Sequence, residues 1–127
     1  MSAKRLDYAV TSRLGEPAHA EPDWTAEHLL LAALGRCSLT SLEFHAKRRN
    51  ITVSGTAEAE GVVTKRDEDG RYAFVELDVC LDVELDPVPD EDGVAELLSL
   101  AERDCFIGAS LTAPSHYAWV VNGSEVA

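Results

Sequence analysis

The segment from Val75 to Asp86 alternates apolar and polar residues without a break, and this pattern restricts the fold more than any other feature of the chain. Side chains of a strand point alternately to opposite faces, so the pattern predicts a long strand with one buried and one acidic face. The buried face should hold Val75, Leu77, Val79, Leu81, Val83 and Leu85, and the polar face Glu76, Asp78, Cys80, Asp82, Glu84 and Asp86. The acids on the polar face are expected to form a solvated surface.

An earlier alternating segment should pair with this strand. From Ile51 to Val63, apolar and small residues share one face, and Thr, Ser and Glu share the other. The small residues indicate that something packs closely over the sheet. The sequence Asp-Glu-Asp-Gly at 67–70 is typical of a hairpin turn. Two further strands are expected over Leu6–Leu14 and His116–Asn122.

Two helices are predicted between these strands. The first should run from near Thr25, with Asp23 or Thr25 as its cap, to about Arg49. Its segment Leu29–Leu34 is apolar on every side, which is typical of a fully buried helix. One sheet covers only one side of a helix, so a second copy of the chain is expected on the other. The second helix should span about Asp92–Asp104, with an apolar stripe of Val94, Leu97, Leu98, Ala101 and Cys105.

The order strand, long helix, hairpin, helix, strand predicts an α+β fold. A length of 127 residues fits one domain over residues 1–127. Within that domain, the long central helix and the second helix should pack on an antiparallel sheet.

Charge and hydropathy exclude several classes of partner. The chain has 11 Lys and Arg against 23 Asp and Glu, a net charge of -12 that would repel nucleic acid and anionic membranes. No apolar run approaches the roughly 20 residues of a membrane span. The N-terminus lacks an apolar signal core, so a cytoplasmic location is expected, in which the three cysteines are thiols.

The cysteines differ in their surroundings. Cys37 and Cys105 both fall on apolar helix faces, where a free cysteine is usually a small buried hydrophobe. The two could meet, which the pattern alone does not decide. Cys80 lies among acids, which raise a thiol pKa, so it is expected to be the poorest nucleophile.

Other site chemistries find little support in the sequence. The four histidines have no ligand spacing with each other or with the cysteines, so no metal is expected. No phosphate-binding loop or dinucleotide motif occurs, so no cofactor is expected. The serines have no evident partners for hydrolytic catalysis; they include Ser12, Ser38, Ser41 and Ser110.

Two segments resemble motifs of the OsmC/Ohr superfamily. Residues 25–37, Thr-Ala-Glu-His-Leu-Leu-Leu-Ala-Ala-Leu-Gly-Arg-Cys, are similar to its central-helix motif. Residues 101–111, Ala-Glu-Arg-Asp-Cys-Phe-Ile-Gly-Ala-Ser-Leu, resemble its second cysteine motif. The final strand, ending in Asn122-Gly123, also matches, so the resemblance covers about residues 27–123.

The resemblance implies an intertwined homodimer with thiol peroxidase activity on organic hydroperoxides, and possible activity on hydrogen peroxide. It assigns Cys37 as the peroxidatic cysteine, which becomes a sulfenic acid, and Cys105 as the resolving cysteine, which forms a disulfide with it. A dithiol, such as a lipoylated protein, then restores both thiols. No cofactor or metal is implied. Apolar residues Leu30, Leu34 and Phe106 are expected to favour bulky organic peroxides.

The resemblance also implies an arginine that favours the thiolate and a glutamate that holds this arginine. Glu27 stands ten positions before Cys37 and matches the glutamate, but ten helical residues span about 15 Å, so it could act only across a dimer interface. Arg13 is the main candidate for the arginine and Arg5 a weaker one. Arg36 should point away from Cys37.

Two departures from the family pattern leave the function open. The region before Glu27 is short, and Phe106 stands where the organic-hydroperoxide branch usually has proline. The alternative hypothesis is therefore a catalytically weak redox-sensing or small-molecule-binding protein with the same fold. A third reading keeps all the cysteines as inert core residues.

Overall fold

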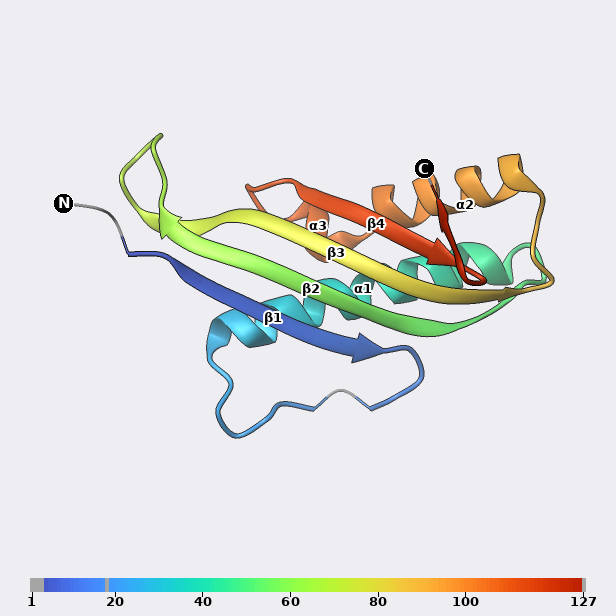
Figure 1. Cartoon of the computed structure of the whole chain (residues 1–127), viewed down its shortest axis with the longest axis horizontal. Coiled ribbons are helices and arrows are strands. Elements are labelled where there is room, and N and C mark those ends of the chain that lie inside the picture. The colour runs from blue at the N-terminus through green and yellow to red at the C-terminus, as the bar shows by residue number, and fades with distance from the viewer. Residues whose placement is uncertain (1–3, 18, 127) are drawn as a thin grey trace.

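The computed structural model describes residues 4–17 and 19–126. Its elements, in chain order, are β1 (Leu6–Arg13), α1 (Ala26–Lys47), β2 (Thr52–Lys65), β3 (Tyr72–Asp86), α2 (Glu91–Arg103), α3 (Phe106–Ala109), β4 (Ser115–Val121) and β5 (Ser124–Val126). The strands form one five-stranded sheet in the order β1-β2-β3-β4-β5. The helices lie together behind the sheet in Figure 1, so the α+β fold class is confirmed.

The sheet is mixed, which corrects the expected antiparallel sheet. β1 and β2, β2 and β3, and β4 and β5 pair antiparallel, whereas β3 and β4 run parallel, with Leu77 opposite Ser115. Parallel neighbours need a crossover connection, because the chain must return to the starting end of the first strand. The segment that contains α2 and α3 makes this return.

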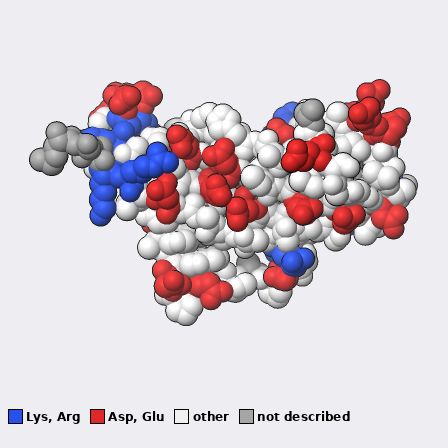
Figure 2. All heavy atoms as spheres, in the orientation of Figure 1, with Lys and Arg blue, Asp and Glu red and all other residues white. Residues whose placement is uncertain are grey.

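The apolar core fills the space between the helices and one sheet face. The expected apolar residues from Leu77 to Leu85 are at most 2% exposed, and α1 contributes fully buried residues such as Leu31 and Leu34. On α2, the expected stripe of Val94, Leu97, Leu98 and Ala101 is buried. The other sheet face carries acids, and Figure 2 shows Asp and Glu spread over it, with Lys and Arg gathered near the β2–β3 hairpin.

A bulge changes which side chain of β3 reaches the core near the hairpin. The pairing shifts between Val62, opposite Glu76, and Val63, opposite Phe74, which leaves Val75 without a partner residue. Phe74 therefore packs against the core, where Val75 was expected. Gly61 makes room for this ring, because a Cβ there would lie 2.5 Å from Phe74 Cε1. Close packing over the small residues of β2 is thus confirmed at this position.

The two main helices begin at polar caps. Thr25 is the N-cap of α1, and its backbone N–H donates to His28 Nδ1 at 3.0 Å. Asp90 caps α2 by accepting a hydrogen bond from Gly93 N at 2.7 Å. No helix within the described ranges is long and apolar enough to cross a membrane.

One side of α1 stays open in the single chain. Leu29 is 48% exposed and Phe44 is 56% exposed, although both are large and apolar. The segment Leu29–Leu34 is therefore not buried on every side by this chain alone. Cover by a second copy stays a prediction.

Candidate functional site

Cys37 lies on α1, with its half-buried thiol facing the start of α3 and the thiol of Cys105. Burial raises the pKa of Cys37, and the Cys105 thiol raises it further. The backbone N–H groups of Ile107 and Phe106 act in the opposite direction, because they favour the thiolate. Within residues 4–17 and 19–126, no Lys or Arg side chain is among the groups that shift this pKa.

Cys105 follows α2 and caps α3, where only 1% of its surface is exposed. It reaches α1 because the apolar stripe of α2 packs on that helix, and Ser41 Oγ on α1 donates to Ala101 O at 2.8 Å. α2 ends at Arg103, one residue earlier than expected, and the short helix α3 was not predicted. The structure therefore brings Cys37 and Cys105 together as free thiols.

Two hydroxyl groups complete the surroundings of Cys105. Ser38 Oγ lies 3.6 Å from Cys105 Sγ and 3.4 Å from Tyr117 Oη, and it donates to Leu34 O at 2.9 Å. Burial raises the pKa of Tyr117 to about 12, so its phenol is protonated at neutral pH. Sequence reasoning missed this pair. Alternation along β4, which places Tyr117 on the inner face with Trp119, was the available signal.

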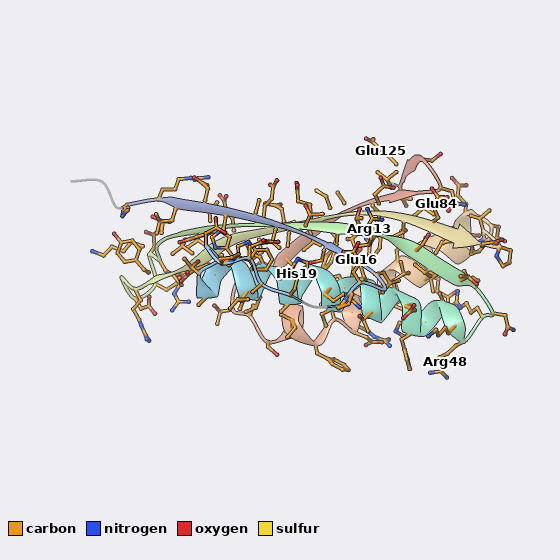
Figure 3. All side chains as sticks on the ribbon, turned by 90° about the horizontal axis from the view of Figure 1, so that it is seen from below. Arg13, Glu16, His19, Arg48, Glu84 and Glu125 are labelled. Atoms are coloured by element: carbon orange, nitrogen blue, oxygen red, sulfur yellow. The ribbon has the colours of Figure 1, made fainter. Side chains whose placement is uncertain are left out.

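A cavity of about 700 Å³ opens beside Cys37. One wall is the face of α1 that carries Leu29, Ala32 and Ala33, and the other is the segment that follows β1 and includes Trp24. Its lining is mainly apolar, with a polar group of Arg13, Glu16, His19, Glu21 and Arg36. Figure 3 shows Arg13, Glu16 and His19 on the side of α1 near the end of β1.

The residues expected to favour organic peroxides do not form this cavity. Leu34 is fully buried in the core, and Phe106 is 77% exposed on α3. Neither residue, nor Leu30, belongs to the cavity lining, which takes its apolar character from Leu29, Ala32, Ala33 and Trp24.

The two arginines of the cavity are held by other groups. Arg36 Nη1 donates to the carbonyl oxygens of Arg13 and Glu16, which ties the segment after β1 to α1. Arg13 Nε lies 3.3 Å from Glu16 Oε1. Arg13 thus shares the cavity with Cys37 without contacting the thiol, and its activating role stays a prediction. Arg36, which was expected to point away from Cys37, is held by these carbonyl oxygens and not by the thiol.

Glu27 lies in the first turn of α1, far along the helix from Cys37. A hydrogen bond with the Thr25 side chain lowers the pKa of its carboxyl, with a smaller contribution from its own backbone N–H. The single chain does not bring Glu27 to the thiols, so a role across a dimer interface also stays a prediction. Arg5 lies 3.2 Å from Asp7, near the other end of β1.

Cys80 lies on the outer sheet face, away from the other two cysteines. Burial raises its pKa most, and Glu60, Glu58 and Asp78 raise it further. The acids act in the expected direction, although they are not the largest cause. In the described parts of the chain, no three His, Cys, Asp or Glu side chains come together as a candidate metal site.

A family model described as "OsmC-like protein" matches residues 18–119, most of the chain. The chain belongs to this family. Membership of the OsmC/Ohr superfamily, which the sequence analysis expected, is thereby confirmed, and the family includes organic hydroperoxide resistance proteins. No curated protein sequence matches the chain significantly.

Solved OsmC-like structures share the fold. An OsmC-like protein of Mycoplasma pneumoniae is 16% identical with a TM-score of 0.67, and the match covers 95% of this chain and 99% of that one. The organic hydroperoxide resistance protein OhrB of Bacillus subtilis is 20% identical with a TM-score of 0.55, over 91% and 98% of the two chains. An OsmC-like protein of unknown function from Vibrio cholerae is 23% identical with a TM-score of 0.61, over 74% of this chain and 62% of its own length.

Proposed function

We propose that this OsmC-like protein is a thiol-dependent peroxidase that reduces organic hydroperoxides through Cys37 and Cys105. The observation that carries the proposal is the placement of the two thiols. Cys37 is half-buried beside an open cavity, and Cys105 is buried directly behind it. The mainly apolar cavity wall suits a peroxide with an organic group better than hydrogen peroxide.

Cys37, Cys105 and a dithiol together account for every bond and every electron in the reaction. The Cys37 thiolate attacks the terminal peroxide oxygen, the O–O bond breaks, and the alcohol leaves with a proton while Cys37 becomes a sulfenic acid. The Cys105 thiol then attacks the Cys37 sulfur, and a disulfide and water form. A dithiol, such as a lipoylated protein, reduces this disulfide and is itself oxidised to a disulfide.

The partners of this chemistry belong to the same proposal. A second copy of the chain covers the open side of α1, which exposes Leu29 and Phe44. The resulting homodimer closes the cavity and brings Glu27 to Arg13, which lines that cavity and favours the Cys37 thiolate. The cytoplasm supplies the reducing conditions that return both cysteines to thiols.

The test is the mass of the reduced protein after one equivalent of cumene hydroperoxide, followed by peptide mapping. We expect a rapid loss of two hydrogens and a Cys37–Cys105 disulfide. Cys37→Ser should abolish the reaction, and Cys105→Ser should stop it at a Cys37 sulfenic acid that dimedone traps. Cys80→Ser is the matched control and should react like the wild type. Free Cys37 and Cys105 thiols after the treatment would falsify the proposal.

A second candidate function is favoured by the raised pKa of Cys37. A thiol that burial keeps protonated reacts slowly with peroxides, as expected for a redox-sensing or small-molecule-binding protein. In that case Cys37 oxidises only at high peroxide concentration and turnover with a dithiol is weak. The same mass experiment, run over a range of peroxide concentrations, separates the two functions.

A further inference from the structure

Ser38 directs its only hydrogen away from Cys105. Its Oγ lies 2.9 Å from Leu34 O, and a carbonyl oxygen only accepts, so the Ser38 hydroxyl donates there. At its two other contacts, 3.6 Å to Cys105 Sγ and 3.4 Å to Tyr117 Oη, Ser38 must then accept. With its hydrogen on Leu34 O, Ser38 offers a lone-pair acceptor to the Cys105 thiol and to the Tyr117 phenol in the reduced protein.

The Cys105 sulfur needs hydrogen-bond donors when it carries a negative charge. The thiol must lose its proton when it attacks Cys37, and it must leave as a sulfur anion when a dithiol opens the disulfide. At 1% exposure, water does not stabilise that anion, and a buried charge without a partner is costly. Ser38 Oγ lies 3.6 Å from the sulfur, and Tyr117 is close enough for Cys105 to raise the pKa of its phenol. Each hydroxyl can rotate about its C–O bond and turn its hydrogen to the sulfur.

We propose that Ser38 and Tyr117 act together as hydroxyl donors that stabilise the Cys105 thiolate while the disulfide with Cys37 forms and opens. When Cys105 loses its proton, Ser38 turns from Leu34 O to Cys105 Sγ, and Tyr117 donates to the same sulfur. When the disulfide is reduced, the departing Cys105 sulfur accepts the same hydrogen bonds before it takes a proton from solvent or from the dithiol.

The proposal rests on the proposed role of Cys105 as resolving thiol, but its test needs no peroxide. The aromatic disulfide dithionitrobenzoate reacts with Cys37 and releases one coloured thiolate. Cys105 then attacks the mixed disulfide, which yields the Cys37–Cys105 disulfide and releases a second thiolate. All variants carry Cys80→Ser, so that the two phases report the two site cysteines alone.

We expect Ser38→Ala and Tyr117→Phe each to slow the second phase about tenfold, which corresponds to the loss of one hydrogen bond to a charged group, and to leave the first phase unchanged. The pH profile of the second phase should shift to more alkaline pH in both variants. The control is Ser54→Ala, because Ser54 is an exposed serine on β2 that lies outside the site. This control should leave both phases unchanged.

The outcomes separate this proposal from the peroxidase. An unchanged second phase in Ser38→Ala, or an equal loss in Ser54→Ala, overturns the hydroxyl role. The absence of a second phase in the wild type overturns it too, because Cys105 then does not resolve a disulfide. If cumene hydroperoxide leaves Cys37 untouched but the second phase depends on Ser38 and Tyr117, the peroxidase proposal fails and the hydroxyl role stands.

Discussion

His45 Nε2 lies 2.7 Å from Asp104 Oδ2, which joins the last turn of α1 to the residue that precedes Cys105. Asp104 also accepts hydrogen bonds from Arg103 Nε and Nη2, each at 3.0 Å. Arg103, and to a smaller extent His45, lower the pKa of the Asp104 carboxyl, and partial burial opposes them. This contact helps to fix the position of Cys105 relative to the helix that carries Cys37.

The lowered pKa of Asp104 predicts a loss of stability in acid. A carboxyl with a depressed pKa in the folded state stabilises the protein above its unfolded pKa, about 3.8, and loses this contribution as the pH falls through the folded pKa. Asp104→Asn should therefore lower the melting temperature at pH 7 and have a smaller effect near pH 3. Asp67→Asn, in the exposed hairpin turn, is the control and should change neither value. An equal effect of Asp104→Asn at both pH values would contradict the prediction.

The pH profile of Cys37 oxidation tests the role of Arg13. Burial raises the pKa of this thiol above its ordinary value of 9.0, so a site without a cation should react faster by about tenfold per pH unit up to pH 9. If Arg13 favours the thiolate in the dimer, the wild-type rate should level off below pH 8, and Arg13→Gln should restore the steep rise. Arg5→Gln is the control. A wild-type rate that climbs through pH 9 would support the weakly catalytic alternative.

Gly55 has no room for a Cβ, whereas Gly35 has, so an alanine at each position tests the packing of the strands and of α1. Gly55 on β2 has φ +151°, and a Cβ there would clash with Asp82 O and lie 2.8 Å from Val83 Cα. Gly55→Ala should lower the free energy of unfolding by about 2–4 kcal/mol. On α1, a Cβ at Gly35 would lie 3.5 Å from Ala57 Cβ, an ordinary contact, so Gly35→Ala should raise it by up to about 1 kcal/mol. Urea denaturation measures both changes, and a tolerated Gly55→Ala would show that the strand pairing at this position is wrong.

The acids around Cys80 should control its reactivity. Glu60 is the charged group that raises the pKa of this thiol most, so Glu60→Gln should increase the thiolate fraction at pH 8. We expect Cys80 alkylation by iodoacetamide, followed by peptide mass, to become roughly twofold faster or more. Glu84→Gln changes an acid of the same strand face that points away from the helices (Figure 3) and should have no effect. Equal rates in Glu60→Gln and the wild type would contradict this assignment.

The local sequence pattern predicted most helices and strands, but it failed to predict side-chain direction where that direction depends on strand pairing. Alternation correctly predicted the burial of Leu77 to Leu85, because a regular strand fixes which face each residue takes. It placed Val75 in the core, whereas the bulge turns Phe74 inward. The bulge depends on how β2 and β3 align, which neither segment specifies alone.

The Asn-Gly pair at 122–123 is a sequence signal for the C-terminal hairpin. Asn122 and Gly123 have φ 49° and 83°, the positive values that a two-residue hairpin turn requires, and Asn-Gly favours such a turn. The short strand β5 follows from it and pairs with β4. The parallel pairing of β3 with β4, by contrast, depends on the path of α2 and α3 and had no local signature.

The sequence by itself determined the α+β fold, the apolar and acidic faces of the long strand, and the two cysteine motifs of the OsmC-like family. These features are local, because periodicity and short motifs are properties of consecutive residues. Only the tertiary structure decided that Cys37 and Cys105 share one site, that Ser38 and Tyr117 surround Cys105, and that Arg13 lies in the cavity without contacting the thiol. These contacts join residues far apart in the chain, and the packing of α1, α2 and β4 against one another sets their distances.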